Sequence, residues 1–233
     1  MPILLALDAS SSACSAALLH RENGRDDRLI SRFEFTPREH TRRLLPMVDA
    51  VLAEAGVVPA ELDAVAYGHG PGSFTGLRIA AGVAQGLAFG LECPLIGVST
   101  LEALALGAYR RHGFHHLFTV LDARMGELYA AAWQCGTDGK LLARMEESLL
   151  APEHLQLPEG SESWVGVGSG WHLKEAMPAG TQAAVRHCLS DCEAAAEDMA
   201  LLAADAFVAG GGRPAQEVQP VYLRDQVAWK KSQ

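Results

Sequence analysis

The 233-residue sequence has few features of a secreted or membrane protein. No apolar run reaches the roughly 20 uncharged residues that a membrane-spanning helix needs. Residues 1–8 lack the basic start of a signal peptide and are expected to contain a strand. The five cysteines form no CxxC motif and are odd in number, which favours reduced core thiols over a disulfide framework. We therefore expect a cytoplasmic globular protein with no membrane contact.

Positive charge is also scarce. Lys and Arg number 19 against 28 Asp and Glu, which gives a formal net charge of −9. Because phosphate contacts need clustered basic side chains, tight unaided binding to nucleic acid is disfavoured. Arg224, Lys230 and Lys231 give the C-terminal end a basic character, which suits either an RNA- or partner-facing tail or a solvated terminus. If RNA is involved, we expect a partner to supply the basic surface.

Several signatures of catalysis and nucleotide binding are missing. No Walker lysine follows Gly76, because the next residues are Leu and Arg. No Gly-x-Ser-x-Gly stands at a strand-to-helix elbow, and Gly168-Ser169-Gly170 is too short a match for a nucleophile motif. No adenosine pocket is legible either, since Gly166, Gly168 and Gly170 suit a tight strand-to-helix turn better than a nucleotide contact.

The most informative segment is the ten residues 69–78, His-Gly-Pro-Gly-Ser-Phe-Thr-Gly-Leu-Arg. It follows a mainly apolar run over 62–67 and opens a helical pattern, so it joins a strand to a helix. Its glycines permit close backbone approaches, and Ser73 or Thr75 can cap the free N–H groups of the helix. Such a helix N-terminus can bind an anion, but a tight turn that serves helix–strand packing is an equal alternative.

The helix predicted over 74–91 is unusually rich in small residues. Gly82, Gly86 and Gly90 recur every four residues, and three alanines form a parallel row. Each glycine costs about 1 kcal/mol of helix propensity relative to alanine, so close approach of another backbone is the simplest compensation. That backbone could belong to the chain's own sheet or to another subunit, and both can hold on opposite faces.

A second amphipathic helix is predicted upstream. Apolar residues recur at helical spacing over 44–55. Thr36-Pro37-Arg38-Glu39 fits a capping box, with its proline at the first helical position. Pro46 would then kink the helix, unless the helix begins nearer Thr41.

The two halves of the chain repeat one pattern. A strand ends at Asp8, and a small polar turn leads to a second strand over 13–20. About 114 residues later a strand ends at Asp122, and a turn leads to a strand over 127–133. Such a duplication predicts two similar lobes that face each other across a cleft.

These segments resemble the fold shared by actin, sugar kinases and heat-shock chaperone ATPases (the ASKHA fold). More specifically they resemble the TsaB (YeaZ) family, the bacterial accessory subunit for making N6-threonylcarbamoyladenosine (t6A) in tRNA. The resemblance implies an α/β fold of two actin-like lobes, 1–112 with the partner-binding helices and 113–233. The motifs that carry it are LDAS (7–10), HTRRLLP (40–46), GPGSFTGLR (70–78), STLEAL (99–104), DAR (122–124) and PVYLR (220–224).

The resemblance implies a subunit that makes no covalent bond itself. It would bind and organise the TsaD transferase and, with it, the TsaE ATPase. TsaD would move the threonylcarbamoyl group onto the adenosine next to the anticodon. This chain alone would require no cofactor, and ATP and metal would be bound by the partner subunits.

The catalytic sister family, TsaD, carries two metal-ligating histidines on the helix that follows the strand matching 94–98. Thr100 and Leu104 stand at the corresponding positions here, and neither can replace an imidazole as a metal ligand. His112 and His116 have the same spacing, but the Gly-Phe pair between them indicates a loop. The sequence therefore predicts no metal site. We interpret two other histidines as hydrogen-bonding residues rather than bases, namely His40 and His69.

The resemblance also implies that the helices near 41–55 and 74–91 pair with the equivalent helices of TsaD. Without that partner, the same surface is expected to form a homodimer, because exposed apolar helices tend to be covered. Contact with tRNA would be indirect. The expected interface residues are Arg42, Leu45, Val48, Leu52, Ile79, Gly82, Val83, Gly86 and Gly90.

A nucleotide site is the remaining hypothesis. Asp8, Ser10 and Asp122 occupy positions where actin-fold ATPases place magnesium- and phosphate-contacting groups, and Gly72 and Ser73 could add phosphate contacts. The alternative functions are therefore an autonomous ATPase or kinase of the actin-like fold, or a peptidase-like protein.

Overall fold

Each half of the chain builds one five-stranded sheet. The elements of the first half are β1 (Ile3–Asp8), β2 (Ala13–His20), β3 (Arg28–Phe35), α1 (His40–Ala55), η1 (Pro59–Glu61), β4 (Ala64–Gly70), α2 (Phe74–Gly90), β5 (Leu95–Ser99) and α3 (Thr100–His112). Those of the second half are β6 (His116–Arg124), β7 (Glu127–Cys135), β8 (Leu141–Leu150), η2 (Pro152–His154), β9 (Val165–Val167), η3 (Ser169–Ala176), α4 (Ala179–Ala184), β10 (His187–Leu189), α5 (Ala196–Val208) and η4 (Ala215–Glu217).

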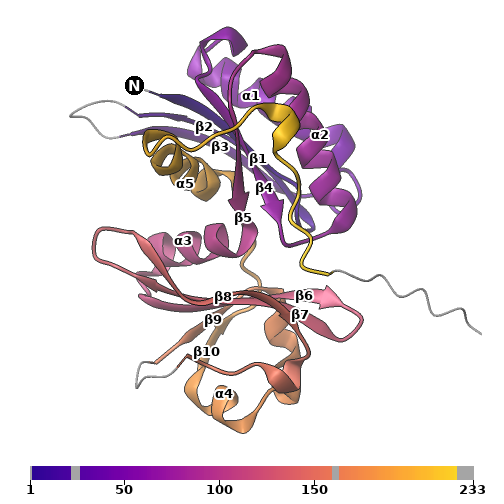
Figure 1. Cartoon of the computed structure of the whole chain (residues 1–233), viewed down its shortest axis with the longest axis vertical. Coiled ribbons are helices and arrows are strands. Elements are labelled where there is room, and N and C mark those ends of the chain that lie inside the picture. Colours follow the sequence, from indigo (N-terminus) through magenta and orange to yellow (C-terminus); the bar gives the residue numbers. More distant parts are fainter. Residues whose placement is uncertain (1, 22–26, 159–162, 225–233) are drawn as a thin grey trace, which may run out of the picture.

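The computed structural model describes residues 2–21, 27–158 and 163–224 (Figure 1). The first five-stranded sheet has the order β3-β2-β1-β4-β5, and the second has the order β10-β9-β6-β7-β8. In each sheet, the three strands that come first in the sequence (β1 to β3, and β6 to β8) pair antiparallel. The two later strands (β4 and β5, and β9 and β10) are added in parallel beside β1 or β6. The second sheet repeats the first strand by strand, which confirms the predicted duplication and the actin-like α/β fold.

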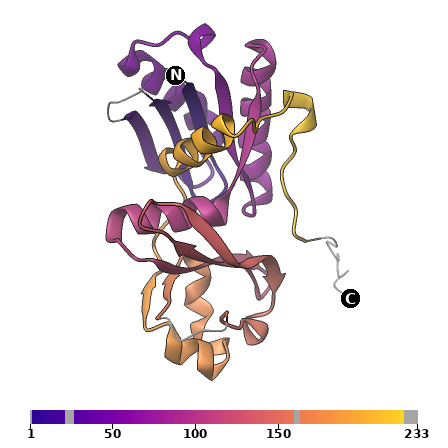
Figure 2. The same ribbon diagram turned by 60° about the vertical axis from the view of Figure 1, so that its left-hand side comes forward.

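Two helices are exchanged between the lobes. α3 leaves the first sheet and packs chiefly on β6 and β7, whereas α5 leaves the second sheet and packs across β1, β2, β4 and β5 (Figures 1 and 2). The predicted boundary after residue 112 falls between α3 and β6. Each sheet is thus covered on its inner face by a helix from the other half. Within the described ranges, no helix has the length and apolarity that a membrane crossing needs.

The opposite face of the first sheet is covered by α1 and α2. Ala80, Ala84 and Ala88 are buried on the inner side of α2, which packs on β4. Methyl side chains let the helix lie close to the sheet, so the alanine row serves the chain's own core. On α1 the buried stripe comprises Leu44, Met47, Val48, Val51 and Leu52.

The start of α1 differs from the prediction. Arg38 adopts the left-handed conformation (φ 69°), and the Glu39 amide donates to the Thr36 carbonyl at 3.1 Å. This turn ends before the helix begins at His40, and Glu39 at the N-cap makes no side-chain capping bond. The predicted capping box is therefore wrong, because a left-handed residue breaks the helical path inside it. The helix begins near Thr41, as the alternative held, and still contains Pro46.

Candidate functional site

The glycine-rich junction between β4 and α2 packs on the turn between β1 and β2. A Cβ on Gly76 would lie 1.8 Å from the Ala9 carbonyl oxygen, and one on Gly72 would lie 2.5 Å from that of Ser10. The Ser73 amide donates to the Ser10 carbonyl at 2.7 Å, and the Ser73 hydroxyl caps α2 by accepting from the Gly76 amide at 3.4 Å. Only glycine fits at these two positions, because the β1–β2 turn of the same chain lies so close. This favours a tight turn that serves packing over an anion-binding site.

Asp8 ends β1 with a fully buried side chain. Its carboxylate accepts hydrogen bonds from the Ser10 amide at 3.1 Å and the Ser10 hydroxyl at 3.0 Å. A Cβ on Gly68 would lie 2.2 Å from Asp8 Oδ1, so the backbone of β4 closes over the carboxyl group. Burial raises the pKa of Asp8 to about 7, although the Ser10 hydrogen bonds oppose the shift. A carboxyl group enclosed in this way, and readily protonated, is a poor magnesium ligand.

Asp122, at the corresponding position of the second lobe, is engaged by its own turn. Its Oδ1 accepts from the Arg124 amide at 2.7 Å, and its Oδ2 accepts from Arg124 Nη1 at 3.1 Å. The Ser169 hydroxyl accepts from the Asp122 amide at 3.3 Å. Asp8, Ser10, Gly72 and Ser73 meet in the first lobe, and Asp122 belongs to the second.

The glycine-rich turn after β9 also contacts protein. A Cβ on Gly166 would lie 2.5 Å from the Trp171 indole, and one on Gly170 would lie 2.5 Å from Val120 Cγ1. Gly168 has a φ of 100° and leads directly into η3. These positions agree with the interpretation as a tight turn.

The histidines are dispersed. His112 ends α3 and stacks on Phe114 with a centroid distance of 5.9 Å, whereas His116 contacts the edge of Trp164 at 5.4 Å. His40 Nε2 lies 3.0 Å from the Ser11 carbonyl oxygen, a local hydrogen bond. Thr100 and Leu104 are buried in α3. Among the described residues, no three His, Cys, Asp or Glu side chains gather as metal ligands.

A second candidate site is the outward face of α1 and α2. Positions for a Cβ on Gly82, Gly86 and Gly90 have no other atom within 4 Å, so these glycines do not pack on the chain's own sheet. Exposed apolar side chains are found on the same two helices; Phe89, for example, is 74% exposed. The glycine row therefore does not serve packing on the chain's own sheet.

The predicted interface needs one correction. Val48 and Leu52 are buried in the core of the first lobe, because they continue the inward stripe that begins at Leu44. They support the helix from beneath and are not available at its surface. Of the other predicted residues, Arg42, Leu45, Gly82, Gly86 and Gly90 are exposed, and Ile79 and Val83 are half-buried.

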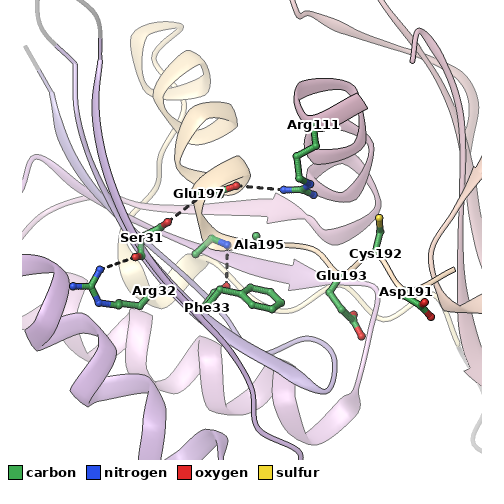
Figure 3. A pocket seen from close by; sticks show the side chains of 11 residues that line it. Ser31, Arg32, Phe33, Arg111, Asp191, Cys192, Glu193, Ala195 and Glu197 are labelled. Atoms are coloured by element: carbon green, nitrogen blue, oxygen red, sulfur yellow. Dashed lines mark hydrogen bonds and ion pairs between the residues drawn. The ribbon is translucent and has the colours of Figure 1, made fainter. Parts of the chain in front are cut away.

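A cavity of about 300 Å³ between β3 and the N-terminal end of α5 was not predicted (Figure 3). Several of its charged groups satisfy one another. Ser31 Oγ donates to Glu197 Oε2 at 3.2 Å, and Arg111 Nη1 donates to Glu197 Oε1 at 3.3 Å. Its lining comes from β2, β3, the end of α3, the segment before α5 and the first turn of α5. No sequence motif joins these segments, so no signal could have indicated the cavity.

The chain resembles known proteins over nearly its whole length. Residues 34–231 match the family TsaD: tRNA N6-adenosine threonylcarbamoyltransferase. A protein of Escherichia coli K12 named tRNA threonylcarbamoyladenosine biosynthesis protein TsaB is 44% identical over 98% of this chain and 97% of its own length. The chain belongs to the TsaB family. The TsaB protein of Haemophilus influenzae is 37% identical over 98% of this chain and 96% of its own length.

A solved structure supports the TsaB assignment. YeaZ from Pseudomonas aeruginosa superposes with a TM-score of 0.88 at 43% sequence identity, covering 96% of this chain and 100% of that one. A second solved structure from the same organism, described as an uncharacterized protein with similarity to peptidase YEAZ, gives a TM-score of 0.89 at 43% identity, covering 96% of this chain and 100% of that one. The resemblance to TsaB (YeaZ) inferred from the motifs is confirmed.

Proposed function

We propose that this chain is a non-catalytic accessory subunit in t6A formation on tRNA, and that it binds and organises a TsaD-type transferase through α1 and α2. The observation that carries the proposal is the unpartnered glycine row of α2. Three glycines each lower helix propensity by about 1 kcal/mol, and a Cβ on any of them would meet no described atom outside the helix's own backbone within 4 Å. A helix of the partner can approach such a face closely, because no side chain holds it away.

We propose no catalytic role because the two aspartates at the positions where actin-fold ATPases contact magnesium or phosphate are engaged by the chain itself. Asp8 is enclosed by Ser10 and β4, and Asp122 is bonded to Arg124. Neither carboxylate is presented to a ligand in this arrangement. ATP and metal would accordingly be bound by the partner subunits, including a TsaE-type ATPase in the larger assembly, and this chain alone would need no cofactor.

The α1–α2 face and the net negative charge of the chain also lead us to propose a homodimer and an indirect contact with tRNA. When the transferase is absent, α1 and α2 would be covered by a second copy of this chain, so the homodimer and the heterodimer would compete. With a formal net charge of −9, the chain would contact tRNA only through its partners, in the cytoplasm.

The first test is mass spectrometry of tRNA nucleosides after depletion of this protein in its native cell. We expect t6A to fall and a rescue copy to restore it. Unchanged t6A under complete depletion would contradict the proposal. Phosphate release by the purified chain, lost on Asp8→Ala, would favour the autonomous ATPase instead, and casein turnover would favour the peptidase-like alternative.

The second test uses Gly86→Leu. The new side chain enters space that is empty in this chain, so the fold should persist. It would hold a partner helix away, and we expect affinity for the purified TsaD-type transferase to fall at least tenfold by titration calorimetry. Gly180→Leu in α4 is the matched control, since Gly180 is exposed and also has no atom within 4 Å of its Cβ position. Full affinity of a folded Gly86→Leu variant would refute this use of α2.

A further inference from the structure

Residues 218–224, here called the C-terminal strap, run from α2 toward the second lobe (Figures 1 and 2). At its start, the Val218 carbonyl accepts from Gln85 Nε2 of α2 at 2.7 Å. Three residues on, the Val221 amide donates to the His69 carbonyl at 2.8 Å. The strap is thus bonded along α2 and at the glycine-rich junction.

The middle of the strap joins an exposed cluster at the N-terminal end of α2. The Arg78 guanidinium lies 3.7 Å from the centre of the Phe74 ring, and Arg78 Nε donates to the Tyr222 hydroxyl at 3.2 Å. The Phe74 and Tyr222 ring centres are 5.8 Å apart. Arg78 thus stacks on the Phe74 ring and is hydrogen-bonded to Tyr222, which fixes the strap to the same helix that carries the glycine row.

The end of the strap is bonded to the second lobe. Arg224 Nη2 donates to the carbonyls of Ala123 at 3.1 Å and Arg124 at 3.4 Å, and it pairs with the Glu127 carboxylate. These acceptors flank the β6–β7 turn, at the end of β6 and the start of β7, and the Arg224 side chain is only 18% exposed. The sequence suggested a basic tail here, but Arg224 is an internal contact. Lys230 and Lys231 lie outside the described residues.

A different contact connects the lobes near α5. Arg110 and Arg111 of α3 pair with the buried Asp198 of α5. Figure 1 shows α5 and the strap on opposite sides of the first lobe. Among the described residues, the Ser99 hydroxyl of β5 also donates to the Glu147 carboxylate of β8, and apolar side chains of α3 and α5 share one buried cluster with both sheets. The strap adds a contact on the other side of the first lobe, and such a separate contact restricts rotation about the α3–α5 region.

We propose that the C-terminal strap fixes the relative orientation of the two lobes by tying the N-terminal end of α2 to the β6–β7 turn. We further infer that this orientation is coupled to occupancy of the α1–α2 face, a part that rests on the proposed function. Phe74 and Arg78 contact the strap and are also exposed on α2. A partner on the α1–α2 face that moves Phe74 or Arg78 would also move Tyr222 of the strap. Partner binding and lobe orientation would then influence each other reciprocally.

The tie is tested on the isolated chain by residual dipolar couplings in solution, which report how the two lobes are oriented. The parent should fit one alignment tensor for both lobes. Arg224→Gln removes the tie from the strap side and Glu127→Gln from the turn side, and each should make the two lobes require different tensors. Arg186→Gln, an exposed change of the same charge in the second lobe, should behave like the parent. A single unchanged tensor in a folded variant of either kind would overturn the tie.

The coupling is tested by titrating the purified TsaD-type transferase into the parent and Arg224→Gln. Allosteric couplings are typically worth 5- to 150-fold in affinity, so we expect binding to weaken by roughly tenfold. Equal affinities, together with altered lobe tensors, would overturn the coupling while supporting the tie. If the parent does not bind the transferase at all, both the proposed function and its coupling to lobe orientation are contradicted. The residual dipolar couplings of the isolated chain would still decide whether the strap ties the lobes.

Discussion

At the scale of single residues, the least expected feature is how completely Asp8 is enclosed. The sequence correctly placed it at the end of a strand, next to a serine that bonds to it. Its burial could not be foreseen, because Gly68 of β4 and Met199 of α5 close over it from distant parts of the chain. The aspartate at the end of the matching strand, Asp122, is bonded to Arg124 instead. Both aspartates accept hydrogen bonds from the residue two positions on, and long-range packing makes the difference in their burial.

This burial predicts a pH-dependent stability. The pKa of Asp8 is raised from 3.8 in the unfolded chain to about 7 in the folded protein, because burial disfavours the charged form. The folded state therefore binds the proton more tightly, and stability from this group is greatest below about pH 4 and falls as the pH rises toward 7. Asp8→Asn, which keeps a hydrogen-bond acceptor and the shape, should remove this dependence.

Urea unfolding of the parent and the Asp8→Asn variant at pH 5 and pH 8 measures the effect. We expect the difference in unfolding free energy between the two proteins to change by a few kcal/mol in favour of the variant at pH 8. Buried carboxyl groups that do not act on Asp8 affect both proteins alike and cancel in the comparison, whereas Glu193, whose charge raises the pKa of Asp8, does not cancel fully. An identical pH slope for the two proteins would show that Asp8 does not titrate in this range.

At the scale of elements, α2 carries most of what the sequence predicted. The Ser73 cap is a local feature of the helix start, and the alanine and glycine rows recur every four residues, about one helical turn. The sequence alone could therefore predict all three. The Thr36–Glu39 capping box failed because the left-handed Arg38 is a property of the folded turn. The strand β8 was not predicted, although residues 141–150 partly alternate between half-buried and exposed positions and complete the duplicated hairpin.

The two kinds of glycine in and near α2 should respond oppositely to alanine. Gly86→Ala adds a methyl group to an exposed helix position with no neighbours and should stabilise the fold by about 1 kcal/mol. Gly76→Ala would place its Cβ 1.8 Å from the Ala9 carbonyl oxygen and should be strongly destabilising. Thermal unfolding of dilute, monomeric protein, in which no second copy covers Gly86, should show Tm rising by about 2–4 °C for the first and falling for the second. A lower Tm for Gly86→Ala would mean that the outer face is packed in the isolated chain.

At the scale of the whole molecule, the exchange of α3 and α5 determines how the lobes hold together. The duplication predicted two lobes from a repeat about 114 residues apart. The exchange, the cavity beside Glu197 and the strap were not predictable, because each depends on contacts between segments that share no motif. The residues between the exchanged helices, Arg110, Arg111 and Asp198, are a salt-bridge cluster with the aspartate fully buried.

Breaking this cluster should cost more than breaking a surface pair on the same helix. Asp198→Ala removes the fully buried carboxylate that two arginines share and leaves them only the partly exposed Glu197, so it should lower the unfolding free energy by about 3 kcal/mol. The matched change is Asp205→Ala, whose partner Arg21 lies 2.7 Å away but whose side chain is 67% exposed, and it should cost at most about 1 kcal/mol. Denaturant titrations of both variants decide the point, and equal losses would show that the cluster does not hold the lobes.

The helix exchange also has a consequence for the growing polypeptide on the ribosome. The inner face of the first sheet, which includes Leu4, Ala6 and Leu19, is covered by α5, whose residues are synthesised last among the long helices. A nascent first half therefore carries a finished set of strands with one apolar face bare until residue 208 has emerged from the exit tunnel. The first lobe can therefore complete its core only after α5 has been synthesised, and its partly folded form exposes the kind of apolar surface that favours aggregation.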